Sequence, residues 1–246
     1  MTSEVTSDAF LGGALYLLQP THGYRAGVDP VLLAASVPAK TGQSVLDLGC
    51  GVGAAILCLA ARVPGLDITG IEKQRLYADL AAQNGKGRLE AILGDIAQMP
   101  ASLRQRQFDH VIANPPYYHR ASRKAGADLG KEVAVGEETP LRVWVKMAAK
   151  RLKPSGQAHF IHRAERLPDI LAAMQRYLGS IEVLPITPRA GRLADRVIVR
   201  AKKSGRADFK LHPPLVMHDG PTHLRDGDSY VPQVKAVLRD GAALPF

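Results

Sequence analysis

The segment from residue 44 to residue 53, SVLDLGCGVG, constrains the fold of this chain more than any other segment. Its apolar run predicts a buried strand, and its glycines lead directly into the helix-like segment AAILCLAARV. A glycine-rich turn between a buried strand and a helix is where α/β sheets bind nucleotides, because glycine lets a ligand approach the backbone closely. We therefore expect a parallel sheet with a ligand site at this turn.

Strand-like and helix-like segments alternate along the rest of the chain. Strands separated by helices of about 10–15 residues predict an α/β fold with a doubly wound, Rossmann-like, mostly parallel sheet of seven strands. The last two strands are joined by a connection too short for a crossover, so they are expected to form an antiparallel hairpin. The predicted strands are residues 44–49, 66–72, 88–95, 108–116, 157–162, 180–187 and 194–203. The predicted helices are residues 54–63, 73–85, 139–156 and 165–179, the third with Thr139 as N-cap and Pro140 in its first position.

Length and composition predict one domain over residues 1–246. A chain of 246 residues with 46% apolar residues can bury one large core, which we expect over residues 44–203. Residues 1–43 then form an N-terminal segment and residues 204–246 a tail. Residues 118–138 and the tail lack clear periodicity and are predicted to be loops.

Targeting signals and metal-binding patterns are not found in the sequence. No run of 18 apolar residues predicts a membrane span, and the first ten residues lack the basic and apolar regions of a secretory signal. Cys50 and Cys58 fit neither a disulfide framework nor a zinc site, and His159 and His162 have no further ligand at metal-site spacing. The sequence thus predicts a reduced, cytoplasmic protein without a metal ion.

The basic residues are concentrated in one part of the chain. The formal net charge is +9, and residues 101–210 contain 22 Lys and Arg against 10 Asp and Glu, whereas the rest contains 10 against 13. Clustered cations gain affinity for a phosphate-rich partner by releasing its counterions. Nucleic acid is therefore a candidate partner, and the alternative is a basic surface that only promotes solubility. Near the predicted hairpin, this basic face is extended by Arg189, Arg192 and Arg196.

Three carboxylates stand at the ends of three successive predicted strands. Asp47 precedes the first glycine of the loop, Glu72 closes the second strand, and Asp95 ends the third strand beside apolar Ile96. Carboxyl ends of parallel strands meet at one edge of a sheet, so these side chains are expected to line one crevice. Glu72 is placed to accept both hydroxyls of a ribose, and Asp95 to accept from the amine of an adenine. The other predicted cofactor-binding residues of this crevice are Gly49, Cys50, Gly51, Gly53, Lys73 and Asn114.

Two adenosine-containing cofactors fit these residues, a nicotinamide dinucleotide and S-adenosylmethionine. The segment FDHVIANPPYYH (108–119) favours S-adenosylmethionine. Hydride transfer gives Asn114, Pro115, Pro116 and Tyr117 no task. In methyl transfer, the Asn114 side-chain oxygen and the Pro115 carbonyl can accept both hydrogens of an exocyclic amine and turn its lone pair toward the methyl group. The prolines restrict the backbone, so these acceptors are held in place before the substrate binds. Tyr117 offers a flat face to an unstacked base.

The motifs VLDLGCGVG, GIE, GDI and NPPYY, in this order and spacing, resemble those of class I S-adenosylmethionine-dependent amino-methyltransferases. Upstream, GYRAGVDPVLLAASV (23–37) is similar to the segment that precedes the glycine loop in bacterial tRNA(Val) adenine-N6-methyltransferases. The segments FIHRAERLPDIL and GDSYVPQVKAVL also resemble that family. The likeness therefore covers nearly the whole chain.

This resemblance implies methyl transfer to the N6 amine of an adenosine beside the anticodon of a folded tRNA. It also implies that Arg25, Gly27 and Asp29 help to close the cofactor pocket. The family members are monomeric or weakly associated, so we expect RNA as the partner and neither a membrane nor a metal ion. From the strand-end pattern, Asp47 and the loop glycines are expected to hold the methionine part of the cofactor.

The segment after Tyr117 is predicted to contact RNA. It is about 20 residues long and carries Arg120, Arg123 and Lys124 close to the target-base turn. Loops of this length without periodicity commonly serve as lids or binding segments. The predicted RNA-binding set is completed by Tyr118 and His119, which can stack on a base or contact phosphate.

Other substrates and a non-enzymatic role stay open at this point. A ribosomal RNA methyltransferase acting on guanine N2 or adenine N6 would use a similar turn. A protein glutamine N5-methyltransferase is disfavoured, because only 46 residues precede Asp47 and that class carries a helical substrate domain there. DNA adenine methyltransferases usually need an added target-recognition domain. A non-catalytic RNA-binding module would need neither the glycine loop nor the Asn-Pro-Pro-Tyr turn.

Overall fold

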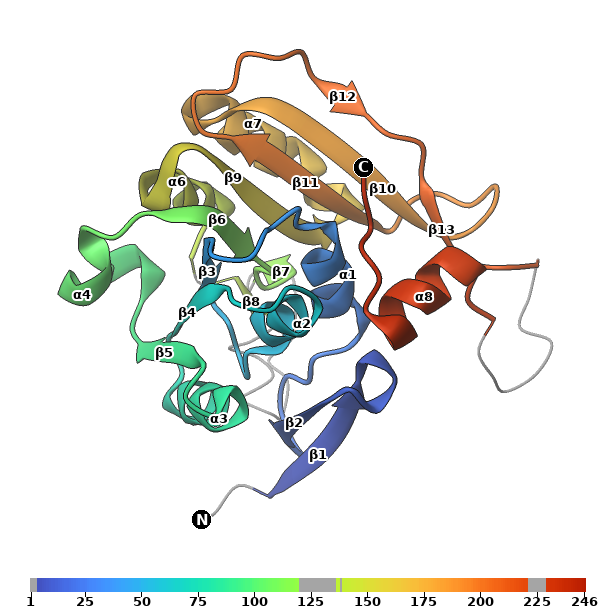
Figure 1. Cartoon of the computed structure of the whole chain (residues 1–246). Coiled ribbons are helices and arrows are strands. Elements are labelled where there is room, and N and C mark those ends of the chain that lie inside the picture. Colours follow the sequence, from blue (N-terminus) through green and yellow to red (C-terminus); the bar gives the residue numbers. More distant parts are fainter. Residues whose placement is uncertain (1–3, 120–135, 138, 221–228) are drawn as a thin grey trace.

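A twisted central sheet organises the molecule (Figure 1). The computed structural model describes residues 4–119, 136–137, 139–220 and 229–246. Within this part of the chain, nine strands form the central sheet in the order β12-β10-β11-β9-β6-β3-β4-β5, with β13 also beside β10. Its seven long strands are β3 (Ser44–Leu48), β4 (Asp67–Glu72), β5 (Leu89–Leu93), β6 (Phe108–Ala113), β9 (Leu152–Arg163), β10 (Gly179–Arg189) and β11 (Arg196–Lys202).

The predicted fold class is confirmed, with a small difference in the number of strands. Strands β3, β4, β5, β6 and β9 are parallel to their neighbours in this group, and β11 pairs antiparallel with both β9 and β10. Two short strands, β12 (Lys210–Leu211) and β13 (Leu215–His218), add to β10 in parallel. The prediction of seven strands missed both, because two to four residues are too few for a visible period-2 pattern.

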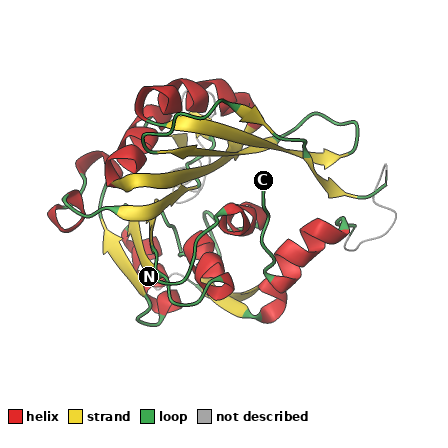
Figure 2. Ribbon diagram, turned by 45° about the horizontal axis from the view of Figure 1, so that its top comes forward, coloured by secondary structure: helices red, strands yellow, loops and turns green. Residues whose placement is uncertain are grey.

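Helices cover both faces of the sheet and make three layers (Figure 2). Strand side chains alternate between two hydrophobic clusters, so that Val45 belongs to one and Leu46 to the other. Helices on the first face are α1 (Val28–Ser36), α2 (Ala54–Arg62), α3 (Arg75–Gly85) and α8 (Pro232–Asp240). Helices on the second face are α4 (Ala101–Arg104), α6 (Leu141–Arg151) and α7 (Leu167–Tyr177). Single helical turns are η1 (Leu11–Gly13), η2 (Ile96–Gln98) and η4 (Ala164–Arg166).

The two ends of the chain contain more structure than their sequence pattern predicts. The N-terminal segment forms the antiparallel hairpin of β1 (Val5–Phe10) and β2 (Leu15–Pro20) before α1. The predicted loop-like tail contains α8, whose Val234 and Val237 are buried against α1 and η1. Tertiary contacts, and not local periodicity, hold these elements in place.

The beginning of α6 also differs from the prediction. The N-cap is Pro140, with no side-chain hydrogen bond to the helix, and Thr139 lies one residue further out. The basic last turn with Lys150 and Arg151 is confirmed. Between Tyr117 and Thr139 the structure describes only the two-residue strands β7 (Tyr118–His119) and β8 (Gly136–Glu137), which pair in parallel. Among the described helices, none has both the length and the apolar character needed to cross a membrane.

Candidate active site

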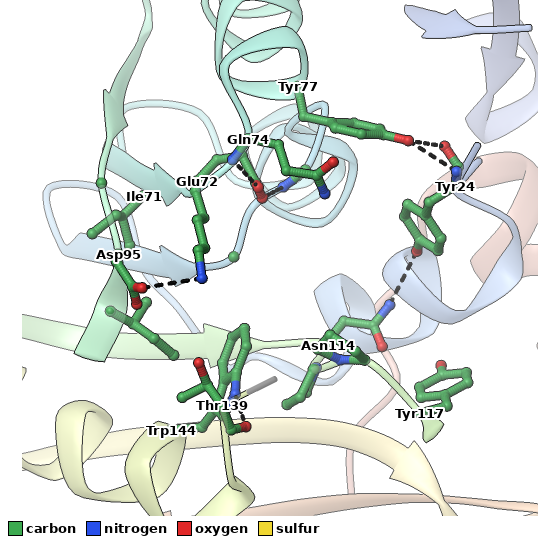
Figure 3. A pocket seen from close by; sticks show the side chains of 17 residues that line it. Tyr24, Ile71, Glu72, Gln74, Tyr77, Asp95, Asn114, Tyr117, Thr139 and Trp144 are labelled. Carbon is green, nitrogen blue, oxygen red and sulfur yellow. Dashed lines mark hydrogen bonds and ion pairs between the residues drawn. The ribbon is translucent and has the colours of Figure 1, made fainter. Parts of the chain in front are cut away.

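A pocket lies where four parallel strands end (Figure 3). Gly49 follows β3, Glu72 ends β4, Asp95 follows β5 and Asn114 follows β6. The order of the strands reverses here, since β4 and β5 lie on one side of β3 and β6 lies on the other, and ligands of open α/β sheets bind at such points. The pocket is lined by Tyr24, Gly49, Gly51, Ile71, Glu72, Lys73, Gln74, Tyr77, Gly94, Asp95, Ile96, Asn114, Pro115, Pro116, Tyr117, Thr139 and Trp144.

The glycine loop closes against the indole of Trp144. Gly49 has a φ of +66°, and a Cβ atom there would lie only 2.6 Å from Cη2 of Trp144. Both the backbone angle and the close approach therefore require glycine at this position. The indole is fixed from its other end, because Nε1 of Trp144 donates to the carbonyl of Thr139 at 3.1 Å.

Glu72 joins the glycine loop to the end of β4. Its carboxylate is only 8% exposed and accepts from the backbone N–H of Gly51 at 3.0 Å and from that of Gln74 at 2.8 Å. Burial raises the pKa of Glu72, while these backbone donors lower it. The backbone N–H of Lys73 is a third donor to this carboxylate, which has about four lone-pair sites, so Glu72 can still accept from a ligand hydroxyl.

Asp95 and Ile96 form the neighbouring wall of the pocket. Asp95 caps η2 by accepting from the backbone N–H of Ala97 at 2.8 Å, and its other oxygen lies 3.3 Å from Nζ of Lys73. Ile96 is buried beside it. Lys73, although predicted to bind the cofactor, thus also forms an ion pair across the pocket rim.

Two tyrosines orient Asn114. Asn114 Nδ2 donates to the hydroxyl of Tyr24 at 3.4 Å, while its buried Oδ1 has no hydrogen-bond partner among the described residues. Tyr24 is itself anchored, because the Tyr77 hydroxyl accepts from its backbone N–H and donates to its carbonyl. Burial, followed by the nearby charges of Asp29 and Asp47, raises the pKa of Tyr24, so its hydroxyl stays protonated. The amide therefore presents a free acceptor at the pocket (Figure 3).

Tyr117 lines the pocket with its ring and turns its hydroxyl away from it. The hydroxyl donates to Oδ2 of Asp29, in the first turn of α1. The resemblance implied that Asp29 closes the cofactor pocket, but this side chain lies behind Tyr117 and does not line the pocket. The ring of His162 on β9 lies 5.2 Å from the Tyr117 ring, centroid to centroid, at an angle of 54°.

Several other predicted cofactor residues also lie outside the pocket lining. Asp47 is buried beneath the loop, where burial and then the charge of Glu72 raise its pKa. Cys50 packs on Gly70, since a Cβ at Gly70 would lie 2.7 Å from Sγ of Cys50. Arg25 is paired with Asp8 on the N-terminal hairpin. Gly27 and Gly53 are the N-cap residues of α1 and α2.

The predicted RNA-binding residues are mostly outside the described part of the chain. Arg120, Arg123 and Lys124 lie in the segment 120–135, which the structure does not describe. For Tyr118 and His119 the structure gives only the backbone of β7. Their role in RNA binding stays a prediction.

Sequence reasoning missed seven lining residues, which are Tyr24, Ile71, Gln74, Tyr77, Gly94, Thr139 and Trp144. The amphipathic pattern of α6 predicts that Trp144 packs in the core. Trp144 does pack there, and its indole also forms a wall of the pocket. Tyr24 and Tyr77 meet only in the folded chain, so no local pattern marks them. Gln74 lies two residues after Glu72, and Thr139 lies just before α6. Only their closeness in sequence to a predicted site residue or helix could have marked them as lining residues.

The donor set of this pocket fits an adenosine-containing cofactor. Glu72 offers acceptors for ribose hydroxyls, Ile71, Ile96 and Trp144 offer apolar walls for a flat base, and the loop glycines offer exposed backbone. Oδ1 of Asn114, which has no hydrogen-bond partner among the described residues, is next to these groups and can accept a hydrogen bond from a ligand. The chemistry of the residues is therefore complementary to a nucleoside cofactor and a second substrate that carries N–H groups.

Comparisons with known proteins relate the chain to methyltransferases. The chain is 28% identical over 187 residues to a tRNA1(Val) (adenine(37)-N6)-methyltransferase of Actinobacillus succinogenes, covering 73% of this chain and 77% of that protein. It is 32% identical over 174 residues to the protein of the same name from Porphyromonas gingivalis, covering 63% and 66%. The crystal structure of a predicted O-methyltransferase from Agrobacterium tumefaciens superposes with a TM-score of 0.73 at 27% identity, covering 89% of this chain and 99% of that one.

The model of one family, the methyltransferase small domain, matches residues 26–189. This range begins just before α1 and extends to the last residue of β10. It thus includes the four strand ends around the pocket, from Gly49 to Asn114 and Tyr117. The chain therefore belongs to the methyltransferase small domain family and is an S-adenosylmethionine-dependent methyltransferase.

Proposed function

We propose that this protein methylates the N6 amine of an adenosine in tRNA, at or near the anticodon. The observation that carries the proposal is Asn114, whose free and buried Oδ1 lies in the pocket while its Nδ2 is occupied by Tyr24. An acceptor held in this way matches an amine, which brings hydrogens to donate. The curated relatives are named for the N6 atom of adenine 37 in tRNA1(Val), which supports this choice of acceptor atom.

The cofactor is expected to lie between the glycine loop and the strand-end carboxylates. When bound, S-adenosylmethionine supplies an electrophilic methyl group. Glu72 accepts from the ribose hydroxyls, and Asp95 accepts from the adenine amine beside Ile96. The backbone at Gly49 and Gly51 approaches the methionine part, which glycine permits because it carries no Cβ.

The residues after β6 are expected to prepare the target amine. The amine nitrogen of adenine is a poor nucleophile, because its lone pair is delocalised into the ring. Asn114 Oδ1 and the Pro115 carbonyl accept its two hydrogens and hold the lone pair outside the plane of the base. Pro115 and Pro116 keep these acceptors in place before the substrate binds. Tyr117 supplies the face on which the unstacked base lies.

The acceptor pair favours an amine over a hydroxyl substrate. A hydroxyl brings a single hydrogen and would leave one of two adjacent acceptors unpaired, which is costly in a buried site. Methylation of a hydroxyl also needs a base, and the two carboxylates of the described pocket lining, Glu72 and Asp95, are assigned to the cofactor in this proposal. The name of the Agrobacterium neighbour specifies oxygen, so the acceptor atom is a question for experiment.

The exposed face of α6 supports an RNA partner. Arg142, Lys146 and Lys150 are exposed and recur every four residues along it, and residues 139–156 contain no Asp or Glu. Residues two positions apart lie on different sides of a helix, so this exposed row faces away from Trp144, which lines the pocket. We expect RNA phosphates to follow it and also to contact Arg123 and Lys124, and we expect a cytoplasmic enzyme that acts as a monomer or weak dimer.

The proposed function is tested by transferring labelled methyl groups from S-adenosylmethionine to total tRNA and, separately, to ribosomal RNA, both from a strain that lacks this protein. Nucleoside mass spectrometry should find N6-methyladenosine in tRNA alone. N2-methylguanosine, or label only in ribosomal RNA, would overturn the proposed substrate. A methylated hydroxyl would overturn the amine assignment, and label in neither RNA would reject RNA methylation.

A further inference from the structure

Three side chains from distant parts of the chain make one continuous polar contact behind the target-base turn. Tyr117 donates its hydroxyl to Oδ2 of Asp29, and Nε of Arg196 lies 2.7 Å from Oδ1 of the same carboxylate. Tyr117 belongs to the turn after β6, Asp29 to the first turn of α1, and Arg196 is the first residue of β11. The fold thus places a charged pair directly behind a residue that lines the pocket.

The carboxylate at the centre of this contact is held firmly. Asp29 is only 8% exposed, its Oδ2 accepts a hydrogen bond from Tyr117, and its Oδ1 is in an ion pair with Arg196. Loss of these partners would leave a buried charge uncompensated. Its place at the N-terminus of α1 adds a favourable interaction with the helix dipole. Arg196 is fixed on its other side as well, because its Nη1 lies 2.7 Å from Oδ2 of Asp195.

Tyr117 is thereby restrained at its hydroxyl and beside its ring. The buried ring of His162 lies next to the Tyr117 ring at a centroid distance of 5.2 Å, and the ring also forms part of the pocket wall. Burial, and after it the charge of Asp29, raises the pKa of Tyr117, so the hydroxyl remains a donor at neutral pH. The hydroxyl is used as a tether, which leaves the ring as the part that can meet a substrate.

We propose that Arg196, acting through Asp29, is a positioning residue that holds the Tyr117 ring in the orientation required to receive the target base. This assignment rests on the proposed methylation of an RNA base. Arg196 was expected from the sequence to extend the basic RNA-binding face, whereas its ion pairs direct it toward Asp29 and Asp195. Its contribution is therefore to the alignment of the base, and only weakly to the attraction of phosphate.

The proposal predicts how substitutions combine. Replacing Arg196 by Met should reduce kcat with RNA by about ten- to a hundredfold, the range that a small misplacement of a substrate causes. Replacing Tyr117 by Phe removes the hydroxyl and should cause a loss of similar size. In the Tyr117→Phe background, Arg196→Met should cause no further loss, because the contact that it supports no longer exists. Arg196→Lys should restore part of the activity, since lysine can still donate to Asp29.

Arg200→Met is the matched control. Arg200 lies on the same strand and also pairs with a partly buried carboxylate, at 3.0 Å from Glu182, but it has no contact with Asp29 or Tyr117. Its replacement should leave kcat within about twofold of the wild type. Calorimetry should show the same affinity for S-adenosylmethionine in all variants, which separates an effect on the base from an effect on the cofactor or on folding.

A second measurement reads the contact without using activity. In protein labelled with 3-fluorotyrosine, the Tyr117 resonance is assigned by its loss in Tyr117→Phe. It should shift in Arg196→Met and stay in place in Arg200→Met. The proposal would be overturned if the losses of kcat in Arg196→Met and Tyr117→Phe multiplied in the double variant. It would also be overturned if the Tyr117 fluorine resonance did not move in Arg196→Met. If wild-type protein methylated no RNA, the proposed function would fail, and the fluorine spectra would still decide whether Arg196 positions Tyr117.

Discussion

The two ends of the Asn114 amide have different environments. Nδ2 faces the Tyr24 hydroxyl, whereas Oδ1 is buried without a partner in the described part of the chain. A buried acceptor left unpaired costs about 1–3 kcal/mol. A substrate N–H that reaches Oδ1 recovers this free energy, so the site is prepared for a donor before any substrate arrives.

Replacing Asn114 by Ala should therefore remove catalysis and spare the cofactor. Loss of one preorganised group of this kind lowers kcat by about a hundred- to a thousandfold, while affinity for S-adenosylmethionine should stay within a few-fold. Single-turnover methylation of tRNA and calorimetry with the cofactor measure the two effects. A variant with wild-type kcat would rule out the clamp, and a parallel loss of cofactor affinity would make Asn114 a cofactor ligand.

Trp144 should report cofactor binding directly. It is the only tryptophan of the chain, and its ring forms one wall of the pocket against Gly49. Adding S-adenosylmethionine should change its fluorescence with the same Kd that calorimetry gives. The variant Trp144→Phe keeps an apolar wall, so it should bind within a few-fold of the wild type and show no signal. Binding by calorimetry without a fluorescence change would place the cofactor elsewhere.

At the scale of elements, α6 has two functional faces. Its buried face carries Trp144 and Val145 against the sheet and the pocket, and its exposed face carries Arg142, Lys146 and Lys150. One amphipathic helix thus supplies a pocket wall and a row of cations that spans about 12 Å, given a rise of 1.5 Å per residue. The same element can connect cofactor binding to the RNA backbone.

Charge reversal of this row tests its role. Changing Arg142, Lys146 and Lys150 together to Glu should weaken tRNA binding and make the negative slope of log K against log salt shallower by about 2, because fewer phosphate contacts release fewer counterions. Affinity for S-adenosylmethionine should not change. The matched control reverses three exposed lysines near helices of the opposite face, of which Lys40 follows α1, Lys86 follows α3 and Lys235 lies on α8. Equal losses of tRNA affinity in both triple variants would show that only the net charge of the protein matters and not the row on α6.

At the scale of the whole molecule, buried titratable groups couple stability to pH. Burial lowers the pKa of His110 and His162 to about 4 and lowers that of His159, so the folded protein keeps these rings neutral. His110 contacts His159 at 3.4 Å and Gln43 at 3.2 Å, between β6, β9 and the start of β3. Between pH 6.5 and 4 the unfolded chain binds protons that the folded chain does not.

The stability contributed by His110 should therefore fall on acidification. From pH 6.5 to pH 4, wild-type protein should lose roughly 3 kcal/mol of unfolding free energy relative to His110→Gln, at about 1.4 kcal/mol per pH unit. Buried Asp47 and Glu72 have the opposite dependence, but they are present in both proteins and cancel. Urea unfolding across this range measures the difference. His22→Gln, which removes an exposed histidine, is the control, and parallel curves for wild type and His110→Gln would contradict the prediction.

Motifs with short-range causes were readable from the sequence. The strand and glycine loop around Gly49, the strand-end residues Glu72 and Asp95, and the turn at Asn114 all depend on neighbours within a few positions. The hairpin of β1 and β2 was also missed. The short strands β12 and β13 and helix α8 were missed because their stability comes from packing on distant elements.

The sequence alone determined the fold class and the edge of the sheet where the pocket lies, because strand periodicity and glycine requirements are local properties of the backbone. The family followed from the resemblance of its motifs to those of known methyltransferases. Tertiary structure alone decided which side chains reach the pocket. Asp47 went beneath the loop and Asp29 behind Tyr117, while Tyr24 and Trp144 entered the lining. Such positions depend on how helices pack on the sheet, and those contacts join residues far apart in the chain.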